Sequence, residues 1–326
     1  MPYHLRFLQF CAKLITANKK ARDIMKITVL RWIAAALLFT AAVLATAPLS
    51  VADAKDGADW MAGVEDEMPI NELSIPGSHD TGATHSIADV AGICQTLSVY
   101  DQLTVGIRFL DIRLQLVNNE LKVVHSFVDQ ALDFDTVLGD ITDFITENPS
   151  EFLIISIKED ADAKGSDIEF KDAVSAALSA CGDIVPTDSS LPKTLGEARG
   201  KIYLLSRYRC AEIGIPAYDG WRDDTSFEIG EIYVQDNYCI TSIGEKKSDI
   251  MHTFEIANER RYSLVLNFTS CYIEGAFPPS YSGTPARSIL PWIEYAAGES
   301  GDTLGIVIMD YVSADLAKII YGRNYA

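Results

Sequence analysis

The sequence predicts an α/β fold, and within that class a (β/α) barrel, for three reasons. Short runs rich in apolar and β-branched residues recur eight times between residues 71 and 309. Helical patterns lie between several of these runs, which is the alternation that a parallel sheet requires. The stretch that carries them is about 250 residues long, a usual length for a barrel. A doubly wound open sheet is the alternative fold.

Each predicted strand is a short apolar run rich in residues that favour strands. The eight runs are residues 71–75, 107–114, 121–124, 152–157, 201–205, 231–234, 263–268 and 303–309. Because proline and glycine break strands, we expect Pro76 and Gly77 to end the first strand and to present the residues that follow on a loop.

Helices are predicted where apolar residues recur every three or four positions. The clearest patterns cover residues 133–147, 168–179, 247–260 and 288–297. Pro149 should stop the first of these helices, because proline cannot continue the hydrogen-bond pattern of a helix. The polar stretch 211–226 is expected to be an insertion on the rim of the barrel.

Residues 1–54 are predicted to be an N-terminal extension plus a secretory signal peptide. Lys26 and Arg31 form a basic region, residues 32–47 are apolar, and residues 52–54 (ADA) offer a cleavage site between small residues. The apolar stretch is short for a stable membrane span, so a membrane anchor is the weaker alternative. Residues 55–326 would then form one domain, secreted to the extracellular space or the periplasm after the signal is removed.

The charge of the domain restricts its partners. The whole chain has a formal charge of −19, and residues 1–54 hold seven of its 27 Lys and Arg but only two of its 46 Asp and Glu. Residues 55–326 therefore carry 20 basic and 44 acidic side chains, a formal charge of −24. A field of this sign disfavours nucleic acid, and electrostatic adsorption to anionic lipid, as partners.

Five cysteines follow residue 54, and they are widely spaced without a C-x-x-C pair, so no zinc site is indicated. Export permits disulfides, but an odd number leaves at least one thiol unpaired. The cysteines therefore give no evidence on function.

Polar side chains follow most of the predicted strands. Barrel enzymes build their sites at the carboxyl ends of the strands, so these side chains should converge at one mouth. They are His79 and Asp80 after the first run, Asp111 and Arg113 near the end of the second, His125 after the third, Lys158 after the fourth, Arg207 after the fifth, Asp236 and Tyr238 after the sixth, and Asp310 after the eighth.

Two histidines, carboxylates to orient them and an arginine are the components of a phosphodiester-cleaving site. One imidazole can remove a proton from an attacking hydroxyl while the other protonates the leaving oxygen. A carboxylate bonded to the far ring nitrogen fixes the tautomer of each imidazole. Arginine binds two phosphate oxygens at once and keeps its charge. The sequence therefore indicates acid–base cleavage of a phosphodiester.

Several short segments that carry polar or glycine-containing motifs occur in order over nearly the whole length after residue 54. They are 73–80 (LSIPGSHD), 106–113 (GIRFLDIR), His125, 148–151 (NPSE) leading to Lys158, 198–207 (ARGKIYLLSR), 234–238 (VQDNY), 267–270 (NFTS) and 309–311 (MDY). Together these segments resemble bacterial phosphatidylinositol-specific phospholipase C of the X-domain family, and the ordered set is more specific than any single motif.

The resemblance implies a distorted, incompletely closed (β/α) barrel and a lyase that converts phosphatidylinositol into diacylglycerol and inositol 1,2-cyclic phosphate, with slow hydrolysis afterwards. By resemblance, His79 is the general base, held by Asp310, and His125 is the general acid, supported by Asp80. Arg113 would bind the phosphate, and Asp111 would support it from beside His125 and Arg113. The residues implied to contact inositol are Lys158, Arg207, Asp236 and Tyr238.

Arg113 also bears on the cofactor, because calcium-dependent relatives carry an acid at the equivalent position. A guanidinium would occupy the place of the metal, so we expect no metal and no other cofactor. The calcium-like run 160–165 (DADAKG) fails as a calcium loop, since Lys164 and Lys171 stand where oxygen ligands belong, and it is interpreted as a solvated turn.

The expected partner is phosphatidylinositol or a glycosylphosphatidylinositol lipid, met by a monomer in transient contact with a membrane surface. Residues 276–281 and Trp292, with Tyr218 and Trp221 on the insertion, are candidate interfacial aromatics. His85 and His252 are expected outside the site. Two alternatives stay open: a calcium-dependent glycerophosphodiester-type phosphodiesterase, and a catalytically silent module that binds inositol lipids.

Overall fold

The computed structural model describes residues 57–85, 93–126, 128–273, 283–299 and 301–325, all within the unit Ala52–Ala326. The predicted signal peptide, residues 1–54, and the predicted aromatic loop, residues 276–281, lie outside the described residues.

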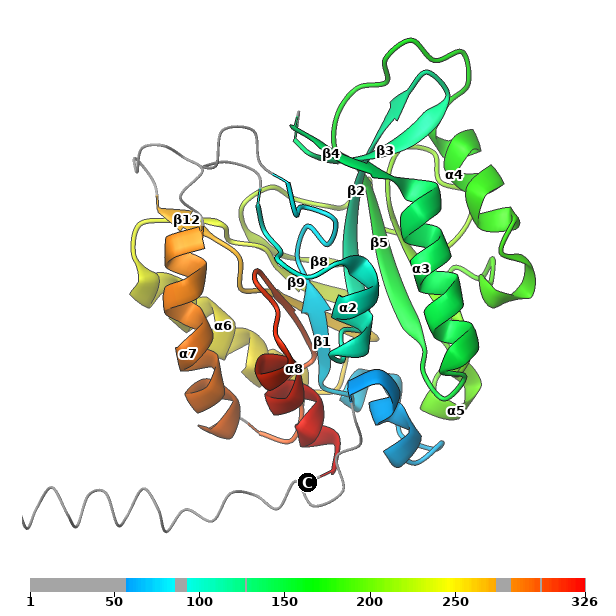
Figure 1. Ribbon diagram of the computed structural model, residues 1–326. Helices are drawn as coiled ribbons and strands as arrows, with labels where there is room; N and C mark the ends of the chain where they lie inside the picture. The colour runs from blue at the N-terminus through cyan, green and yellow to red at the C-terminus, as the bar shows by residue number, and fades with distance from the viewer. Residues whose placement is uncertain (1–56, 86–92, 127, 274–282, 300, 326) are drawn as a thin grey trace, which may run out of the picture. The chain divides into compact units, whose positions relative to one another are not determined.

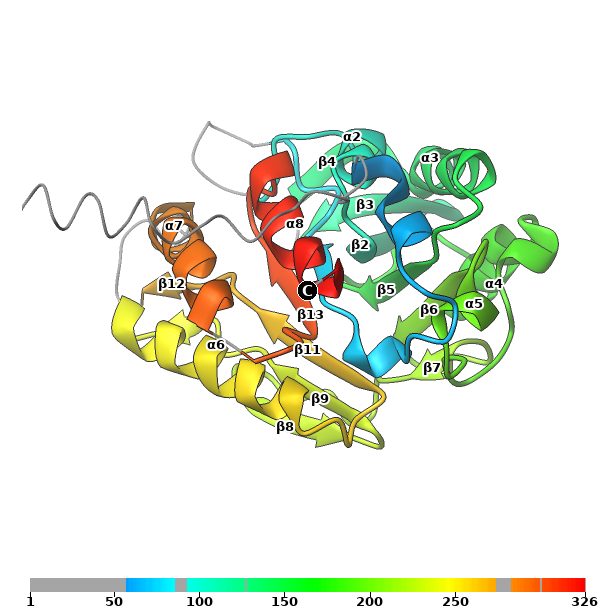
Figure 2. The same cartoon turned by 90° about the horizontal axis from the view of Figure 1, so that it is seen from below.

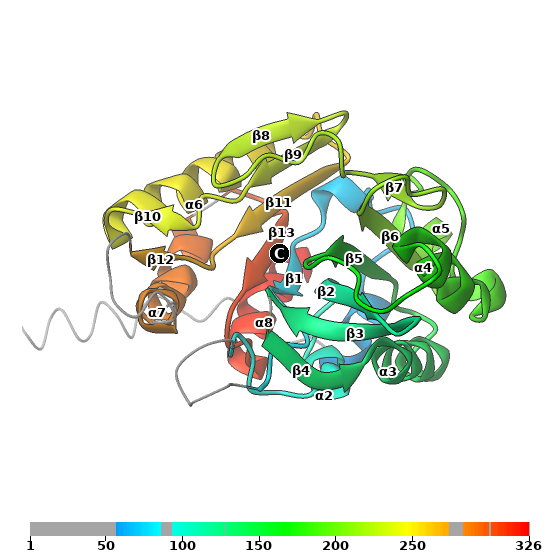
Figure 3. The ribbon, with the colours of Figure 1, turned by 90° about the horizontal axis from the view of Figure 1, so that it is seen from above.

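Seven parallel strands form the central sheet, which is strongly curled (Figure 3). Their order is β6-β5-β2-β1-β13-β11-β9, with a short β7 beyond β6 and an antiparallel β8 beyond β9. The strands are β1 (Ile75–Ser78), β2 (Phe109–Val117), β5 (Leu153–Glu159), β6 (Ile202–Arg207), β7 (Ile215–Pro216), β8 (Ser226–Ile229), β9 (Ile232–Gln235), β11 (Leu264–Phe268) and β13 (Ile306–Met309). The sheet stays open between β7 and β8, which confirms the distorted, incompletely closed barrel.

One predicted barrel strand is part of a hairpin instead. The run 121–124 belongs to β3 (Glu120–His125), which pairs antiparallel with β2 and then with β4 (Val128–Asp133). The β2–β3 turn uses Asn118 and Asn119, both at positive φ (51° and 68°), a conformation that tight hairpin turns require and asparagine tolerates. Periodicity alone does not distinguish a hairpin strand from a barrel strand, so the predicted strand pairing was wrong here.

The prediction that Pro76 and Gly77 end the first strand is also wrong, because both lie inside β1. The odd-numbered residues of β1 face β13: Ile75 N donates to Gly305 O and His79 N donates to Met309 O. Pro76 therefore faces β2. Strand β2 pairs with β1 only from Gly77 onward, so the N–H that proline lacks would have no hydrogen-bond partner in the sheet. A Cβ on Gly77 would lie 3.1 Å from Phe109 and Ile308 side-chain atoms, which explains a glycine in this crowded strand.

Helices cover the outer face of the curled sheet (Figure 1). They are α2 (Val99–Thr104), α3 (Phe134–Glu147), α4 (Phe170–Ser179), α5 (Leu195–Ala198), α6 (Ile243–Asn258), α7 (Gly283–Glu299) and α8 (Ala314–Tyr321). The four predicted helices correspond to α3, α4, α6 and α7, and α3 ends just before Pro149 as expected. The shorter α2, α5 and α8 were not predicted, since fewer than three turns give a weak periodic signal. Among the described residues, no helix combines the length and the apolar character that a membrane span needs.

Short elements complete the fold. They are the 3-10 helices η1 (Gly57–Gly63), η2 (Ile70–Glu72), η3 (Gly182–Ile184) and η4 (Gly322–Tyr325), and the strand pair β10 (Cys239–Ile240) and β12 (Tyr272–Ile273). At the amino end of the barrel, η1 packs against α2 and α8 (Figure 2). There the buried guanidinium of Arg108 bonds to Glu151 and to the carbonyls of Gly57 and Ala58.

Candidate active site

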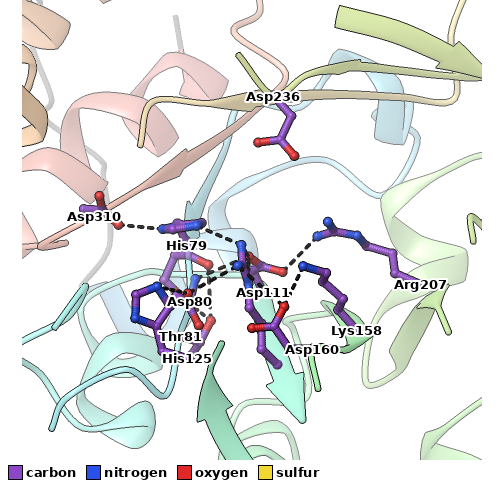
Figure 4. A network of polar contacts seen from close by, with 12 residues as sticks. His79, Asp80, Thr81, Asp111, His125, Lys158, Asp160, Arg207, Asp236 and Asp310 are labelled. Carbon is purple, nitrogen blue, oxygen red and sulfur yellow. Dashed lines mark hydrogen bonds and ion pairs between the residues drawn. The ribbon is translucent and has the colours of Figure 1, made fainter. Parts of the chain in front are cut away.

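Polar side chains gather at the carboxyl end of the barrel, as the sequence predicts (Figure 4). His79 directly follows β1 and Asp310 directly follows β13, so the parallel pairing of these strands brings the two residues together. Arg113 lies within the long strand β2, beside Lys158 of β5. His125 comes from the hairpin instead: Val123 pairs with Leu114, and His125 therefore returns to the level of Asp111 and Arg113.

His79 makes one hydrogen bond through each ring nitrogen. Nδ1 lies 2.7 Å from Asp310 Oδ1, and Nε2 lies 2.9 Å from Arg113 Nη2. A guanidinium can only donate, so Nε2 carries the lone pair and the Nδ1 hydrogen points to Asp310. Burial lowers the pKa of His79, but the charge and hydrogen bond of Asp310 outweigh it, and the pKa is raised. The imidazole is thus arranged to accept a proton at Nε2.

His125 and Asp80 form the second pair. His125 Nε2 lies 3.3 Å from Asp80 Oδ2, and Arg113 Nη1 lies 3.5 Å from the same oxygen. Burial raises the pKa of Asp80, and Arg113 and His125 offset this only in part. Asp80 adopts a positive φ of 46°, an uncommon backbone conformation directly after His79, and its Oδ2 lies near His125. The two imidazoles therefore have separate carboxylate partners.

Asp111 connects two arginines beneath the histidines. Its Oδ2 accepts from Arg113 Nη2 at 3.2 Å and its Oδ1 accepts from Arg207 Nη1 at 3.1 Å. Burial alone would raise the pKa of Asp111, but the two guanidinium groups hold it well below its usual range. Its third partner is the backbone N–H of Asp80. The expected contact of Asp111 with Arg113 is thus present, and Arg207 is a further partner that the sequence did not indicate.

Asp160 belongs to the site, although the sequence interpretation placed it in a solvated turn. Its side chain is only 5% exposed and lies 2.5 Å from Lys158 Nζ and 3.9 Å from Arg113 Nη1. The other oxygen, Oδ2, accepts from the backbone N–H of Ser126, the residue after His125. Burial opposes its charge, yet Arg113 and Lys158 lower its pKa. The sequence did not identify Asp160 as a site residue, because the run 160–165 was interpreted as a failed calcium loop and not as an extension of β5.

Arg207 and Asp236 lie against a tryptophan from the predicted rim insertion. The guanidinium carbon of Arg207 is 3.5 Å from the ring centre of Trp221, whose Nε1 donates to Asp236 Oδ2 at 3.4 Å. Burial raises the pKa of Asp236, and Arg207 offsets part of the effect. Trp221 also packs against Phe227 and remains partly exposed, so it forms a wall of the site.

Tyr238 is held by the same insertion. Its hydroxyl donates to Asp223 Oδ1 at 2.6 Å, and its ring lies 5.9 Å from that of Tyr272. Of the other aromatics proposed for a membrane surface, Tyr218 is 45% exposed, whereas Trp292 packs under Lys247 with a 5.1 Å separation between the ammonium and the ring centre. The stretch 211–226 therefore contributes to the site as well as to the rim.

The site offers one group of donor atoms that could be considered for a metal ion. Ligand atoms of His79, Asp80 and Cys94 lie within 4.8 Å of one another. However, both nitrogens of His79 already have partners, and the guanidinium of Arg113 lies beside the same atoms. A cation placed there would be repelled by Arg113 and would have to displace Asp310 or Arg113 from the ring. The donor set therefore does not fit a resident metal.

The remaining residues agree with their expected positions. His85 is exposed, with its backbone N–H bonded to Gln130, and His252 is an exposed partner of Glu255.

The five cysteines of the described chain, Cys94, Cys181, Cys210, Cys239 and Cys271, are all free thiols.

Comparison with known proteins gives a consistent family assignment. The profile of the phosphatidylinositol-specific phospholipase C X domain matches residues 67–208, which include the strands from β1 to β6. A 1-phosphatidylinositol phosphodiesterase of Listeria monocytogenes is 28% identical over 273 residues, covering 81% of this chain and 84% of that protein. One from Staphylococcus aureus strain Newman is 26% identical over 207 residues, covering 56% of this chain and 65% of its own.

Solved structures show the same similarity in three dimensions. A Staphylococcus aureus phosphatidylinositol-specific phospholipase C, studied for the modulation of its membrane binding, superimposes with a TM-score of 0.71 at 25% identity, over 82% of this chain and 98% of the other. The Listeria monocytogenes enzyme superimposes with a TM-score of 0.65 at 25% identity, over 82% and 99%. The similarity therefore extends over the whole barrel.

Proposed function

Because the chain belongs to the bacterial phosphatidylinositol-specific phospholipase C X-domain family, we propose that it is a metal-independent phosphatidylinositol diacylglycerol-lyase. It would cleave phosphatidylinositol, or its glycosylated form, into diacylglycerol and inositol 1,2-cyclic phosphate. The observation that carries this proposal is the pair of histidines, each with its own carboxylate, on either side of the Arg113 guanidinium.

In this mechanism His79 Nε2 removes the proton of the inositol 2-hydroxyl. The oxygen attacks phosphorus, a new P–O bond forms, and the bond to the diacylglycerol oxygen breaks as His125 donates a proton to it. Asp310 stabilises the imidazolium that forms at His79. Because the nucleophile belongs to the substrate, no metal-bound water is required.

Arg113 has two functions in this scheme. In the free protein it donates to Nε2 of His79, so the 2-hydroxyl must take this place when substrate binds. The guanidinium can then bind the phosphate oxygens as a pair and stabilise the developing charge. Asp111, held well below its usual pKa by two arginines, remains charged throughout and fixes both guanidinium groups.

The inositol ring would lie on the opposite side of Arg113 from the lipid. Lys158, Arg207 and Asp236 offer donors and acceptors for its hydroxyls, and Tyr238 offers a ring face. Arg207 and Asp236 are fixed against Trp221, so this part of the pocket is preorganised.

Phosphorus NMR of the purified protein with phosphatidylinositol micelles and excess EDTA tests the proposal. A cyclic inositol phosphate signal is expected, and His79→Ala and His125→Ala should each remove nearly all of it while the fold remains intact. A variant that keeps more than about a tenth of the parent turnover would contradict its role. Silence that calcium reverses would indicate a metal-dependent phosphodiesterase, and silence in both conditions would indicate a lipid-binding module.

The cellular setting is part of the proposal. Residues 1–54 would be a leader that is removed, and residues 55–326 a secreted monomer in transient contact with the membrane. Mass spectrometry of the protein exported by its host should give an N-terminus near residue 55. A cell-associated protein with an intact N-terminus would contradict secretion and favour an anchor.

A further inference from the structure

A fully buried glutamine connects the ends of the two strands that carry His79 and Asp310. Gln95 Nε2 donates to the carbonyl of His79 at 2.7 Å and to that of Met309, the residue before Asp310, at 2.9 Å. Its Oε1 accepts from Val312 N at 3.1 Å. Both amide hydrogens and the carbonyl of this side chain are therefore used on backbone that flanks the His79–Asp310 pair.

The backbone next to Gln95 holds the same region. Tyr311 N donates to Cys94 O at 2.8 Å, and the Tyr311 hydroxyl donates to Ile93 O at 2.9 Å. On the other side, the backbone N–H groups of Cys94 and Gln95 both donate to Ala83 O. Residues 93–95 thus lie between the segment that follows β1 and the segment that follows β13.

This bridge is located where the sheet no longer holds the two chains together. The last paired residues of β1 and β13 are Ser78 and Met309, and one further bond joins His79 N to Met309 O. Beyond it the chain turns through Tyr311 at a φ of 52°, a conformation that must be held by its surroundings. The hydrogen bond between the His79 and Asp310 side chains depends on this unpaired region (Figure 4).

We propose that Gln95 is a positioning residue for the catalytic base: by binding the carbonyls of His79 and Met309 and the N–H of Val312, it fixes the Asp310 carboxylate against Nδ1 of His79. The proposal rests on the role of His79 in the proposed function. The geometric part can be tested without substrate, because it concerns only the contact between His79 and Asp310.

The electrostatic surroundings of His79 give the direction of the expected effect. The groups that face it are Asp310 beyond β13, Arg113 and Asp111 on β2, Asp80 next in the chain, Asp236 beyond β9, and the Cys94 thiol. Burial and Arg113 lower the pKa of His79, whereas Asp310 provides the largest opposing effect. If Asp310 moves away, the pKa of His79 should fall.

The decisive experiment is an NMR titration of the histidine rings in the purified protein, with the His79 signal identified by its loss in His79→Asn. Gln95→Met keeps the volume of the side chain but removes its hydrogen bonds, and Gln95→Asn keeps the amide but shortens its reach. Both variants should titrate His79 at a lower pH than the parent. The loss of kcat should be about a hundredfold, as for a displacement of about 1 Å, with a smaller change in KM.

Gln102 provides a matched control. It is equally buried and its Nε2 also donates to two carbonyls, those of Thr81 and Leu97, but it does not bridge β1 and β13. Gln102→Met should destabilise the fold without moving the His79 titration. The inference is overturned if His79 titrates at the parent pH in both Gln95 variants, or if Gln102→Met shifts it equally. A shift of the His79 titration in a protein that does not cleave phosphatidylinositol would uphold the inference and reject the proposed function.

Discussion

Arg113 is the residue that connects the parts of the site. Its guanidinium contacts Asp80, Asp111, Asp160 and the Nε2 atom of His79. Five donors in a rigid plane allow this, and a single ammonium does not. The residue therefore organises both histidine–carboxylate pairs before any phosphate is bound.

Arg113→Lys should consequently lose most of the activity even though the charge is kept. We expect kcat/KM on phosphatidylinositol to fall by about a hundredfold or more, because an ammonium cannot bind two phosphate oxygens while it remains paired with Asp111. Steady-state kinetics with circular dichroism as a check on folding measures this. Near-normal rates would mean that Arg113 serves the structure alone.

Asp160 should control the position of Lys158 and of the His125 loop. Asp160→Asn keeps an acceptor for Ser126 N but removes the charge that pairs with Lys158. A hydrogen bond to a charged group contributes about 1.5–3 kcal/mol, so kcat/KM should fall about ten- to a hundredfold.

Asp162 is the control for this variant, because it lies two residues further along and is exposed. Asp162→Asn should retain the parent kcat/KM. Equal losses in the two variants would point to a general effect of reduced negative charge and would contradict a specific role for Asp160.

At the level of elements, the hairpin β3–β4 brings the second histidine into a site that is otherwise built from parallel strands. Strand β2 is nine residues long, so it projects past the barrel and can pair with β3 there. Three residues in the site or directly after a site residue have a positive φ: Asp80, Ser126 and Tyr311. Backbone of this kind is held in place by neighbouring elements, as Asp160 holds Ser126.

The opposite end of the barrel is fastened by a buried ion pair between Arg108 and Glu151. Their side chains lie 2.8 Å apart without exposure, and Glu151 also accepts from Met61 N in η1. Glu151→Gln should lower the free energy of unfolding by about 3–5 kcal/mol, because it leaves the Arg108 charge buried without a counter-charge. Urea denaturation measures the loss, and KM should stay unchanged because this end is remote from the site.

An exposed ion pair supplies the comparison for that variant. Lys122 bonds to Glu120 and Asp133 at the surface of the hairpin. Lys122→Gln should change the urea midpoint far less than Glu151→Gln, since solvent screens exposed pairs. If both variants lost the same stability, the buried pair would have no special part in fastening η1.

For the molecule as a whole, the charge of −24 on residues 55–326 predicts an unusual response to salt. An anionic protein and an anionic phosphatidylinositol surface repel each other, and salt at about 0.1 M shortens the range of that repulsion to about 10 Å. The initial rate on phosphatidylinositol vesicles should therefore rise between low and moderate ionic strength. Dilution of the vesicles with a zwitterionic lipid should reduce the effect, whereas a rate that falls with salt would reveal a local basic contact.

The sequence predicted those parts of the protein that depend on local pattern. Strand and helix periodicity predicted the parallel sheet and helices α3, α4, α6 and α7, whereas the distorted, open form of the barrel was implied by the family resemblance. The residues at the strand ends predicted that the histidines, Arg113 and Asp310 lie in the site. Short helices such as α8 carry too few periodic positions to be recognised. The effect of Pro76 on its strand was predicted wrongly. It depends on whether the N–H that proline lacks would face a paired neighbouring strand, and a local pattern does not show this.

The tertiary structure alone decided which side chains meet across distant segments. By itself the sequence determined an acidic α/β barrel with two histidines and an arginine at its mouth. It could not show that Asp160 reaches Ser126, that Trp221 supports Arg207, or that Gln95 bridges β1 and β13. The physical reason is that periodicity reports which face of an element is buried, whereas the partner of a buried polar group is set by the packing of elements far apart in the chain.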